Sequence, residues 1–335
     1  MHVQLKHTLS IFSLAIVVVI GLVSCKKSKN PTPTHANTGV DVYLVGYAPG
    51  DSAVVATYWK NGLKITLPES FSEGNAIAIQ GNDVYVAGTK YDGTQTHALY
   101  WKNGVVSKIA ENSAANAIVV DGNDLYVGGS IDGKAAYWKN GIVVNLIDSL
   151  ATSSVSGIDI DGNDVYMCGT SWDAHGASTA TYWKNGVPTY LKGFYTSSAH
   201  GIAIKDGDVY VVGTEAPTPY SVSAVYWINS VPTILYDGNK SSLGLAIALN
   251  GSDTYIAGDF VMGDQLTHGY WKNGVVTEFQ DNANSSNGIA INGSDVYVSG
   301  TTDITGSSTG YWKNSNFIQI SNEGSYITGI AVIAK

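Results

Sequence analysis

Histidines, cysteines and repeated carboxylates are the residues of this 335-residue chain whose chemistry could support a reaction. Four histidines follow the N-terminal segment, and none lies in a His-Glu-x-x-His or Cys-x-x-Cys pattern: His97, His175, His200 and His268. No Gly-x-Ser-x-Gly motif and no glycine-rich phosphate loop occurs. The sequence therefore predicts no bound metal, no cofactor and no catalytic nucleophile. A pair of carboxylates that meets across distant segments, as in glycosidases, stays open at this point.

An aspartate recurs seven times within the unit Asp-x-Tyr-x-x-Gly. The copies are Asp41, Asp83, Asp124, Asp164, Asp208, Asp253 and Asp295. The spacing of Asp159, Asp161 and Asp164 does not match the Asp-x-Asp-x-Asp-Gly of an EF-hand calcium loop. Aspartate side chains commonly accept hydrogen bonds in tight turns, so we predict that role for all seven.

A Tyr-Trp pair also recurs seven times, with Lys-Asn after it in six copies. The tryptophans are Trp59, Trp101, Trp138, Trp183, Trp227, Trp271 and Trp312. Tryptophans can stack on sugars, but a fixed place beside a hairpin favours packing inside the fold. The six lysines are expected to form a solvated rim, with an anion-binding ring as the weaker alternative: Lys60, Lys102, Lys139, Lys184, Lys272 and Lys313.

Composition and charge exclude one class of partner. The formal net charge is −9, and all 18 basic residues are lysines. Arginine is the preferred side chain for binding phosphates and guanine edges. We therefore expect no nucleic-acid binding.

The two cysteines have different predicted fates. Cys168 lies in an apolar run and is expected to pack as a small hydrophobic residue. Cys25 ends a Leu-Val-Ser-Cys motif that resembles the lipobox of bacterial lipoproteins, directly after the apolar run Ile11 to Val23. We predict a signal peptide over 1–24 and a lipidated Cys25 with a flexible tether over 25–39, so that the membrane is reached through the anchor alone. The expected location is the bacterial cell envelope, at the outer membrane, facing the periplasm or the cell surface.

The repeats predict an all-β fold over 40–335. Their period of about 37 to 45 residues is typical of four-stranded propeller blades. In each repeat a Gly-Ile-Ala-Ile-like strand, such as Gly201 to Ile204, precedes an Asp-Val-Tyr-Val-like strand, such as Asp208 to Val212. The third strand ends in Tyr-Trp, and the fourth follows Asn-Gly, which is a strong hairpin signal. Seven copies therefore predict a seven-bladed β-propeller.

The two ends of the repeat region predict how the ring closes. The first Asp-x-Tyr unit, at Asp41, has no Gly-Ile-Ala-Ile strand before it. An extra copy of that strand, Gly329 to Val332, ends the chain. We predict that the C-terminal strand completes the first blade, because such closure removes open sheet edges. With its edges paired, the protein is expected to be a monomer.

The segment Ala76 to Thr89 resembles the bacterial SBBP-type β-propeller repeat, and the likeness extends over Val40 to Lys335. The Tyr-Trp-Lys-Asn-Gly half of each repeat lies outside that pattern. The resemblance implies a propeller fold and an exported setting, and it supplies no catalytic residues.

Variable loops on one face of the ring are the predicted functional site, since a rigid scaffold commonly presents binding residues on loops. The loops lie between second and third strands and between blades, and they carry aromatic and polar candidates for ligand binding: Tyr91, Trp172, Asp173, His175, Tyr195, Tyr220 and Phe260. Trp172 is the only tryptophan outside the repeated position. The alternative interpretation is that these side chains fold back onto neighbouring loops.

The sequence favours a binding or scaffolding module for a glycan or a protein partner. An aromatic platform on the loops is the feature that supports it. A glycan-acting envelope enzyme, a hydrolase or lyase with its site at the mouth of the central channel, is the alternative. A purely structural envelope protein is the third possibility. Two carboxylates with raised pKa values in one pocket would favour the enzyme.

Overall fold

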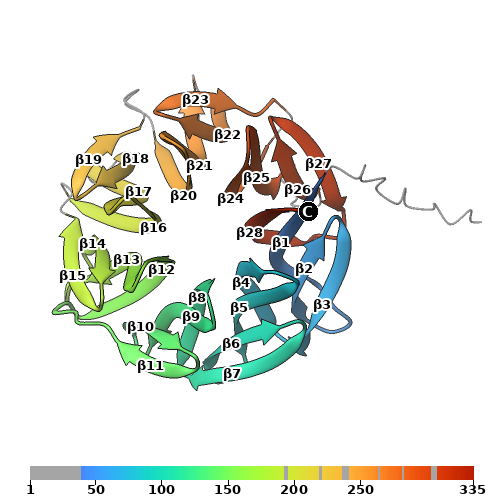
Figure 1. The fold of residues 1–335 in the computed structure, drawn as a ribbon. Coiled ribbons are helices and arrows are strands. Elements are labelled where there is room, and N and C mark those ends of the chain that lie inside the picture. Colours follow the sequence, from blue (N-terminus) through green and yellow to red (C-terminus); the bar gives the residue numbers. More distant parts are fainter. Residues whose placement is uncertain are drawn as a thin grey trace, which may run out of the picture. The chain divides into compact units, whose positions relative to one another are not determined.

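The computed structural model describes residues 39–191, 195–218, 221–235, 241–262, 265–280, 283–302 and 308–335. These residues form seven four-stranded antiparallel sheets, arranged as the blades of a ring (Figure 1). The seven-bladed β-propeller predicted from the repeats is therefore confirmed. The predicted signal peptide, Cys25 and nearly all of the tether lie outside the described residues. Within the described part of the chain, no helix is long and apolar enough to span a membrane.

Each blade follows the order of its repeat, from an innermost strand at the centre of the ring to an outermost strand at the rim. The innermost strands are β4 (Ser72–Gln80), β8 (Ser113–Asp121), β12 (Thr152–Asp161), β16 (Thr196–Lys205), β20 (Ser242–Asn250), β24 (Ser285–Asn292) and β28 (Tyr326–Ala334). The second strands are β1 (Val40–Pro49), β5 (Asp83–Tyr91), β9 (Asp124–Ile131), β13 (Asp164–Trp172), β17 (Asp208–Thr218), β21 (Asp253–Met262) and β25 (Asp295–Thr301). The third strands are β2 (Val54–Lys60), β6 (Thr96–Lys102), β10 (Lys134–Lys139), β14 (Ser178–Lys184), β18 (Ser221–Ile228), β22 (Gln265–Lys272) and β26 (Thr309–Lys313). The outermost strands are β3 (Leu63–Ser70), β7 (Val105–Glu111), β11 (Ile142–Asn145), β15 (Val187–Leu191), β19 (Val231–Ile234), β23 (Val275–Glu278) and β27 (Asn316–Ser321).

The ring closes through the last strand, β28, which pairs with the first, β1. The antiparallel register runs from Val40 opposite Ala334 to Tyr47 opposite Tyr326. The C-terminal strand therefore supplies the innermost strand of the first blade, as the sequence predicts. The inner edge of β1 is paired as a result, so it offers no template for pairing with another chain.

The two faces of the ring differ in their connections. On the turn face, tight turns join the first strand to the second and the third to the fourth. On the loop face, the connections between second and third strands and between blades are more varied. The hairpin after each third strand has two residues with positive φ, for example 50° at Asn185 and 82° at Gly186. These angles fit the type I′ turns that Asn-Gly predicts.

Each repeated aspartate binds the hairpin of its own blade. Asn185 Nδ2 donates a 2.7 Å hydrogen bond to Asp164 Oδ1, and the N–H of Val165 donates a 2.9 Å bond to Asn185 Oδ1. The same two bonds recur in all seven blades. In six blades the rim lysine adds an ion pair, which measures 2.8 Å between Lys184 and Asp164. The predicted turn role of the aspartates is confirmed, and the pairing of the rim lysines weakens the anion-binding alternative.

We expect the propeller to lose stability in acid. Hydrogen bonds from the rim lysine and the hairpin asparagine lower the pKa of six repeated aspartates: Asp83, Asp124, Asp164, Asp253, Asp295 and Asp41, where they outweigh the opposing effect of burial. A carboxyl with a lowered folded-state pKa stabilises the fold above its unfolded value of about 3.9, and this contribution is lost as the pH falls through the folded value. Burial raises the pKa of Asp159 and of Glu215, and these two groups act in the opposite sense.

Urea denaturation between pH 7 and pH 3 measures this balance. The urea concentration at the midpoint of unfolding should decrease once the pH is below about 4, because carboxyls begin to protonate there. The variant Asp164→Asn keeps an acceptor but does not titrate, so its midpoint should depend less on pH than that of the unmodified protein. A midpoint that stays constant or rises on acidification would contradict the prediction.

A β-bulge in each innermost strand explains the repeated glycine of the second strand. The register between β16 and β17 shifts between Ala199 and Gly201, so His200 has no partner residue. The corresponding shift occurs in the other six blades. Beside the bulge, a Cβ on Gly213 would lie 1.9 Å from the carbonyl oxygen of Ser198. The equivalent glycines of the other blades would bring a Cβ to between 1.8 and 2.1 Å from a carbonyl oxygen. Only glycine fits this position.

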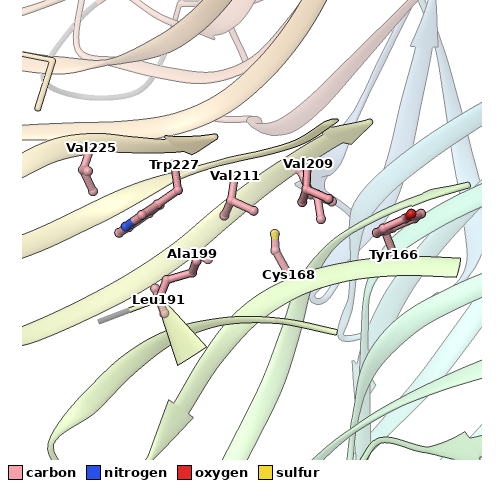
Figure 2. Packing of buried hydrophobic residues seen from close by; sticks show 10 residues of the cluster. Tyr166, Cys168, Leu191, Ala199, Val209, Val211, Val225 and Trp227 are labelled. Carbon is pink, nitrogen blue, oxygen red and sulfur yellow. The ribbon is translucent and has the colours of Figure 1, made fainter. Parts of the chain in front are cut away.

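The core consists of layers between neighbouring blades. All seven repeated tryptophans are buried in these layers, which confirms their predicted packing role. Figure 2 shows one layer, where Cys168 of β13 lies against Val209 and Val211 of β17 and near Trp227 of β18. Cys168 is fully buried, and burial raises the pKa of its thiol, so it packs as a hydrophobic residue as predicted.

Repeated serines also join neighbouring blades. Six of them stand at the same distance before the repeated aspartate, or at the matching place in β28: Ser72, Ser113, Ser153, Ser197, Ser242 and Ser325. The first five accept a hydrogen bond of 2.9 to 3.0 Å from an alanine N–H on the third strand of the preceding blade. These buried bonds fix the spacing between blades.

Candidate functional site

The predicted site residues that the structure describes lie toward the loop face and belong to several blades. Tyr91 ends β5 and is 50% exposed, and Tyr195 precedes β16 and is 66% exposed. Trp172 ends β13 and is half-buried. Tyr220 lies outside the described residues. Because the blades of β5 and β13 are not neighbours, the structure does not bring Tyr91 and Trp172 onto one aromatic platform.

Phe260 corrects the predicted list, since it is not an exposed loop residue. It belongs to β21, which extends through Met262, and its side chain has 0% exposure. Its ring centroid lies 5.1 Å from that of the repeated Trp271. The strand therefore continues into the segment predicted as a variable loop, and pairing of Phe260 with Thr267 of β22 keeps it within the sheet.

Asp173 and His175 form a tight turn after β13. Asp173 Oδ1 accepts hydrogen bonds from the N–H groups of His175, at 2.8 Å, and Ala177, at 3.0 Å. These main-chain bonds lower the pKa of the Asp173 carboxyl. His175 is exposed. Asp173 therefore shapes the turn, and His175 is the more accessible of the two side chains.

An aromatic cleft lies where the connection into β4 meets the loop after β5. Its volume is about 430 Å³, and its walls are Ser70, Phe71, Lys90, Tyr91, Asp92 and Gly93. Phe71 is 57% exposed and Tyr91 50%. The N–H of Tyr91 donates a 2.9 Å hydrogen bond to the carbonyl of Phe71, and the Tyr91 hydroxyl donates a 2.9 Å bond to Gly93. Both rings are therefore attached to a hydrogen-bonded backbone.

Phe71 has a strained backbone, which sequence reasoning missed. Its φ is 57°, and that of Glu69 is 91°. The equivalent places in two other blades hold Asn112 and Gly324, also at positive φ, and these residue types tolerate this region. A phenylalanine with this φ has a strained backbone, and because its side chain is exposed, no burial offsets the free energy of that strain. Strain of this kind is typical of functional positions. The signal in the sequence is a bulky residue at the repeat position where Asn or Gly would suit the turn.

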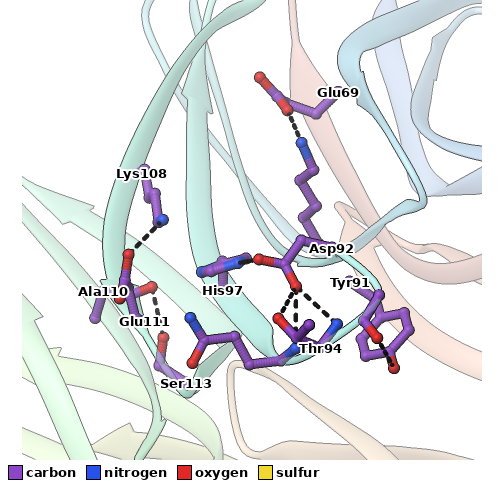
Figure 3. A network of polar contacts seen from close by, with 12 residues as sticks. Glu69, Tyr91, Asp92, Thr94, His97, Lys108, Ala110, Glu111 and Ser113 are labelled. Carbon is purple, nitrogen blue, oxygen red and sulfur yellow. Dashed lines mark hydrogen bonds and ion pairs between the residues drawn. The ribbon is translucent and has the colours of Figure 1, made fainter.

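A polar network borders the cleft (Figure 3). Asp92 Oδ1 accepts bonds from the Thr94 N–H at 2.9 Å and the Thr94 hydroxyl at 2.7 Å, and Asp92 Oδ2 accepts a 2.6 Å bond from His97 Nε2. The Thr94 hydroxyl, main-chain N–H groups and His97 hold the pKa of the Asp92 carboxyl well below its usual range. Lys90 forms an ion pair with Glu69. The cleft thus combines apolar rings with charged groups of both signs.

A Ser–His–Asp set on β21, β22 and β24 does not have the geometry of a catalytic triad. His268 Nδ1 lies 2.6 Å from Asp259 Oδ1. The Ser286 hydroxyl lies 2.9 Å from the same oxygen and 2.8 Å from the Gly258 carbonyl. In a triad the serine would face the far ring nitrogen of the histidine. Here the hydroxyl is directed at the carboxylate, so the set orders the interior of the blades.

Among the described residues, burial raises the pKa of two carboxyls, Asp159 on β12 and Glu215 on β17. Asp159 accepts bonds from the N–H groups of Ile160, at 2.9 Å, and Ile204, at 2.8 Å. Neither carboxyl lines the aromatic cleft. No group of three or more metal-ligating residues occurs among the described residues. The geometry therefore gives no support to an acid–base pair in this cleft.

Comparisons with known proteins show the fold. No protein-family model matches the chain. No curated protein matches it either. The β-propeller domain of the Trilobed protease from Pyrococcus furiosus is similar with a TM-score of 0.54 and 10% identity, over 86% of this chain and 94% of that one. That domain is described as having an open velcro topology, whereas β28 pairs with β1 here.

A puromycin-hydrolyzing peptidase from Mycobacterium tuberculosis is similar with a TM-score of 0.57 and 13% identity, over 84% of this chain and 52% of the peptidase. This chain therefore spans about half the length of that protein. At such identities the likeness concerns the fold alone, because unrelated functions share one fold.

Proposed function

We propose that this protein is a non-catalytic glycan-binding module of the bacterial cell envelope. The observation that carries the proposal is the cleft between Phe71 and Tyr91, in which two exposed rings face a volume of about 430 Å³. Sugar rings have apolar faces and polar edges. Aromatic rings suit the faces, and Lys90, Asp92 and Glu69 lie where hydroxyl groups need donors and acceptors.

Pre-organisation supports the same proposal. The hydroxyl of Ser72 donates a 2.5 Å bond to the Glu69 carbonyl and accepts a 3.0 Å bond from the Ala56 N–H. Both ends of the strained segment are therefore held before a ligand arrives. Binding then costs less conformational entropy than it would if the loop had to order around the ligand.

The glycan proposal is tested by a glycan array and a panel of envelope polysaccharides, with the purified protein. We expect Tyr91→Ala to weaken binding about tenfold, since loss of an aromatic contact of about 1.4 kcal/mol has that effect. Phe71→Asn places the residue of the equivalent Asn112 in the strained position. It should weaken binding while leaving the melting temperature equal or higher. Tyr195→Ala, at an exposed tyrosine outside the cleft, is the matched control and should bind normally.

Two outcomes would overturn the proposal. One is the absence of binding to every glycan tested, after which chemical cross-linking in cells would search for a protein partner. The other is hydrolysis or elimination of a bound glycan, which would favour the enzyme interpretation.

The cellular setting belongs to the proposal. We infer that the signal peptide over 1–24 is removed, that Cys25 carries the lipid, and that the propeller is a monomer at the outer membrane. The lipobox-like motif supports this setting. Labelling of cells with a radioactive fatty acid should mark the protein, and Cys25→Ser should abolish the label and release the protein from the membrane fraction. An unlabelled protein with Cys25 intact would contradict the anchor.

A further inference from the structure

The innermost strands of all seven blades surround the axis of the ring (Figure 1). Residues of these seven strands line a central cavity. Its volume is about 380 Å³. Each innermost strand contributes three consecutive residues to its wall, for example Asn75, Ala76 and Ile77 of β4. The size falls within the range of about 300 to 1,000 Å³ that is usual for small-molecule sites.

Two of the three wall positions repeat around the ring, and the third varies. One is isoleucine in all seven blades, and one is glycine or alanine. The third is the bulge residue of each innermost strand. We call these seven residues the bulge ring: Asn75, Asn116, Ser156, His200, Leu245, Asn287 and Thr328. The ring scaffold therefore presents five kinds of side chain at one level of the cavity, with asparagine in three of the seven blades.

Hydrogen bonds fix most of the bulge ring. Five members lie within hydrogen-bond distance of a carbonyl oxygen of the next blade, at 2.6 to 2.9 Å. Three of these bonds come from asparagine Nδ2 atoms, for example from Asn75 to Ala115 at 2.8 Å. An amide that donates through Nδ2 keeps its Oδ1 as an acceptor. The asparagines of the ring are therefore held in place with acceptor capacity left over.

The ring of His200 adds a further hydrogen-bond acceptor, and a hydrogen bond at its other nitrogen indicates which tautomer is present. Its Nδ1 lies 2.7 Å from the Gly244 carbonyl, so this nitrogen carries the hydrogen. Burial lowers the pKa of the His200 ring, which keeps it neutral near pH 7. Nε2 then carries a lone pair, and among the residues that the structure describes the hydrogen bond of the His200 ring is made through Nδ1 alone. This nitrogen is a hydrogen-bond acceptor available to a molecule in the cavity.

The wall of the cavity carries no formal charge. None of the lining residues is Asp, Glu, Lys or Arg. The nearby carboxyl of Asp159, on the same strand as Ser156, is not among them and accepts two main-chain N–H groups. A charged ligand would have no counter-charge in this wall, which is unfavourable for binding. A ligand with several hydroxyl groups could donate to the acceptors and place its C–H surfaces against Leu245 and the isoleucines.

We propose that the central cavity is a binding site for a neutral sugar of one or two rings, with the bulge ring as its recognition element. This site shares no residue with the aromatic cleft, so the inference does not depend on the proposed function. His200 Nε2 accepts a hydrogen bond from a sugar hydroxyl, and the asparagine Oδ1 atoms accept others.

The probes are D-glucose, N-acetyl-D-glucosamine and their β-1,4-linked disaccharides, with D-glucuronate as the charged counterpart of D-glucose. The full-length protein labelled with 15N-histidine reports on the site through the Nε2 resonance of His200. We expect at least one neutral sugar to shift this resonance in a saturable way, and D-glucuronate to bind at least tenfold more weakly than D-glucose or not at all.

Two variants localise the effect. His200→Leu should raise the dissociation constant of the sugar, measured by calorimetry, at least tenfold. The variant should stay folded, because Leu245 already occupies the equivalent position in another blade. Tyr91→Ala should leave this dissociation constant unchanged, which separates the cavity from the aromatic cleft. The proposal is overturned if no neutral sugar shifts the His200 signal, if D-glucuronate binds as well as D-glucose, or if folded His200→Leu binds sugar normally.

Discussion

Replacing Gly213 by alanine is expected to lower the free energy of unfolding by about 3 kcal/mol or more, the upper end of the usual cost of overpacking. The new Cβ would lie 1.9 Å from the Ser198 carbonyl oxygen and 2.9 Å from its carbon. Both atoms belong to the main chain of the neighbouring β16, so no side-chain rotation can relieve the contact. The bulge that holds His200 in the cavity wall would have to move.

A second glycine provides the matched control. Gly329 lies in the innermost strand β28, at the place where other blades carry Ala76, Ala117 and Ala246. A Cβ there would come 3.3 Å from Val45 Cγ1, which is a movable side-chain atom. Gly329→Ala should therefore change the free energy of unfolding by less than about 1 kcal/mol. Urea denaturation followed by tryptophan fluorescence measures both variants, and equal stabilities would show that the bulge is not the reason for the repeated glycine.

Removal of β28 is expected to have the largest effect on the fold. A chain that ends before Tyr326 loses every partner of the inner edge of β1, from Val40 to Tyr47. It also loses Ile327, which is fully buried beside Leu44 and Trp59. The exposed strand edge and apolar surface should make the truncated protein aggregate or unfold at 25 °C, because open edges recruit other chains.

A peptide supplied in trans makes this prediction specific. A synthetic peptide with the sequence of residues 324–335 should restore a monomeric, cooperatively unfolding protein when it is present during refolding. A peptide of the same composition in scrambled order should not. Size-exclusion chromatography and circular dichroism give the readout. A truncated chain that remains monomeric and as stable as the full-length protein would show that closure by β28 is dispensable.

The sequence alone determined the architecture, because each repeat carries its own local signals. Asn-Gly turns, the Asp-x-Tyr-x-x-Gly unit and the extra last strand that begins at Gly329 together predict seven blades and their closure. The buried tryptophans and the turn role of aspartates such as Asp164 follow from the same regularity. A residue that recurs at one place in every repeat meets the same surroundings each time, so its structural role can be inferred without coordinates.

Only the tertiary structure decided which side chains form a site. Phe260 is an aromatic next to a variable loop, and its burial depends on how far β21 continues and on Trp271. Phe71 matters through its strained backbone and through the main-chain hydrogen bond that brings it beside Tyr91. His200 belongs to no recognised motif in the sequence, yet the bulge places it in the wall of the central cavity with six bulge residues from the other blades. Bulges, strand ends and contacts between blades are set by packing among distant segments, and no spacing along the chain encodes them.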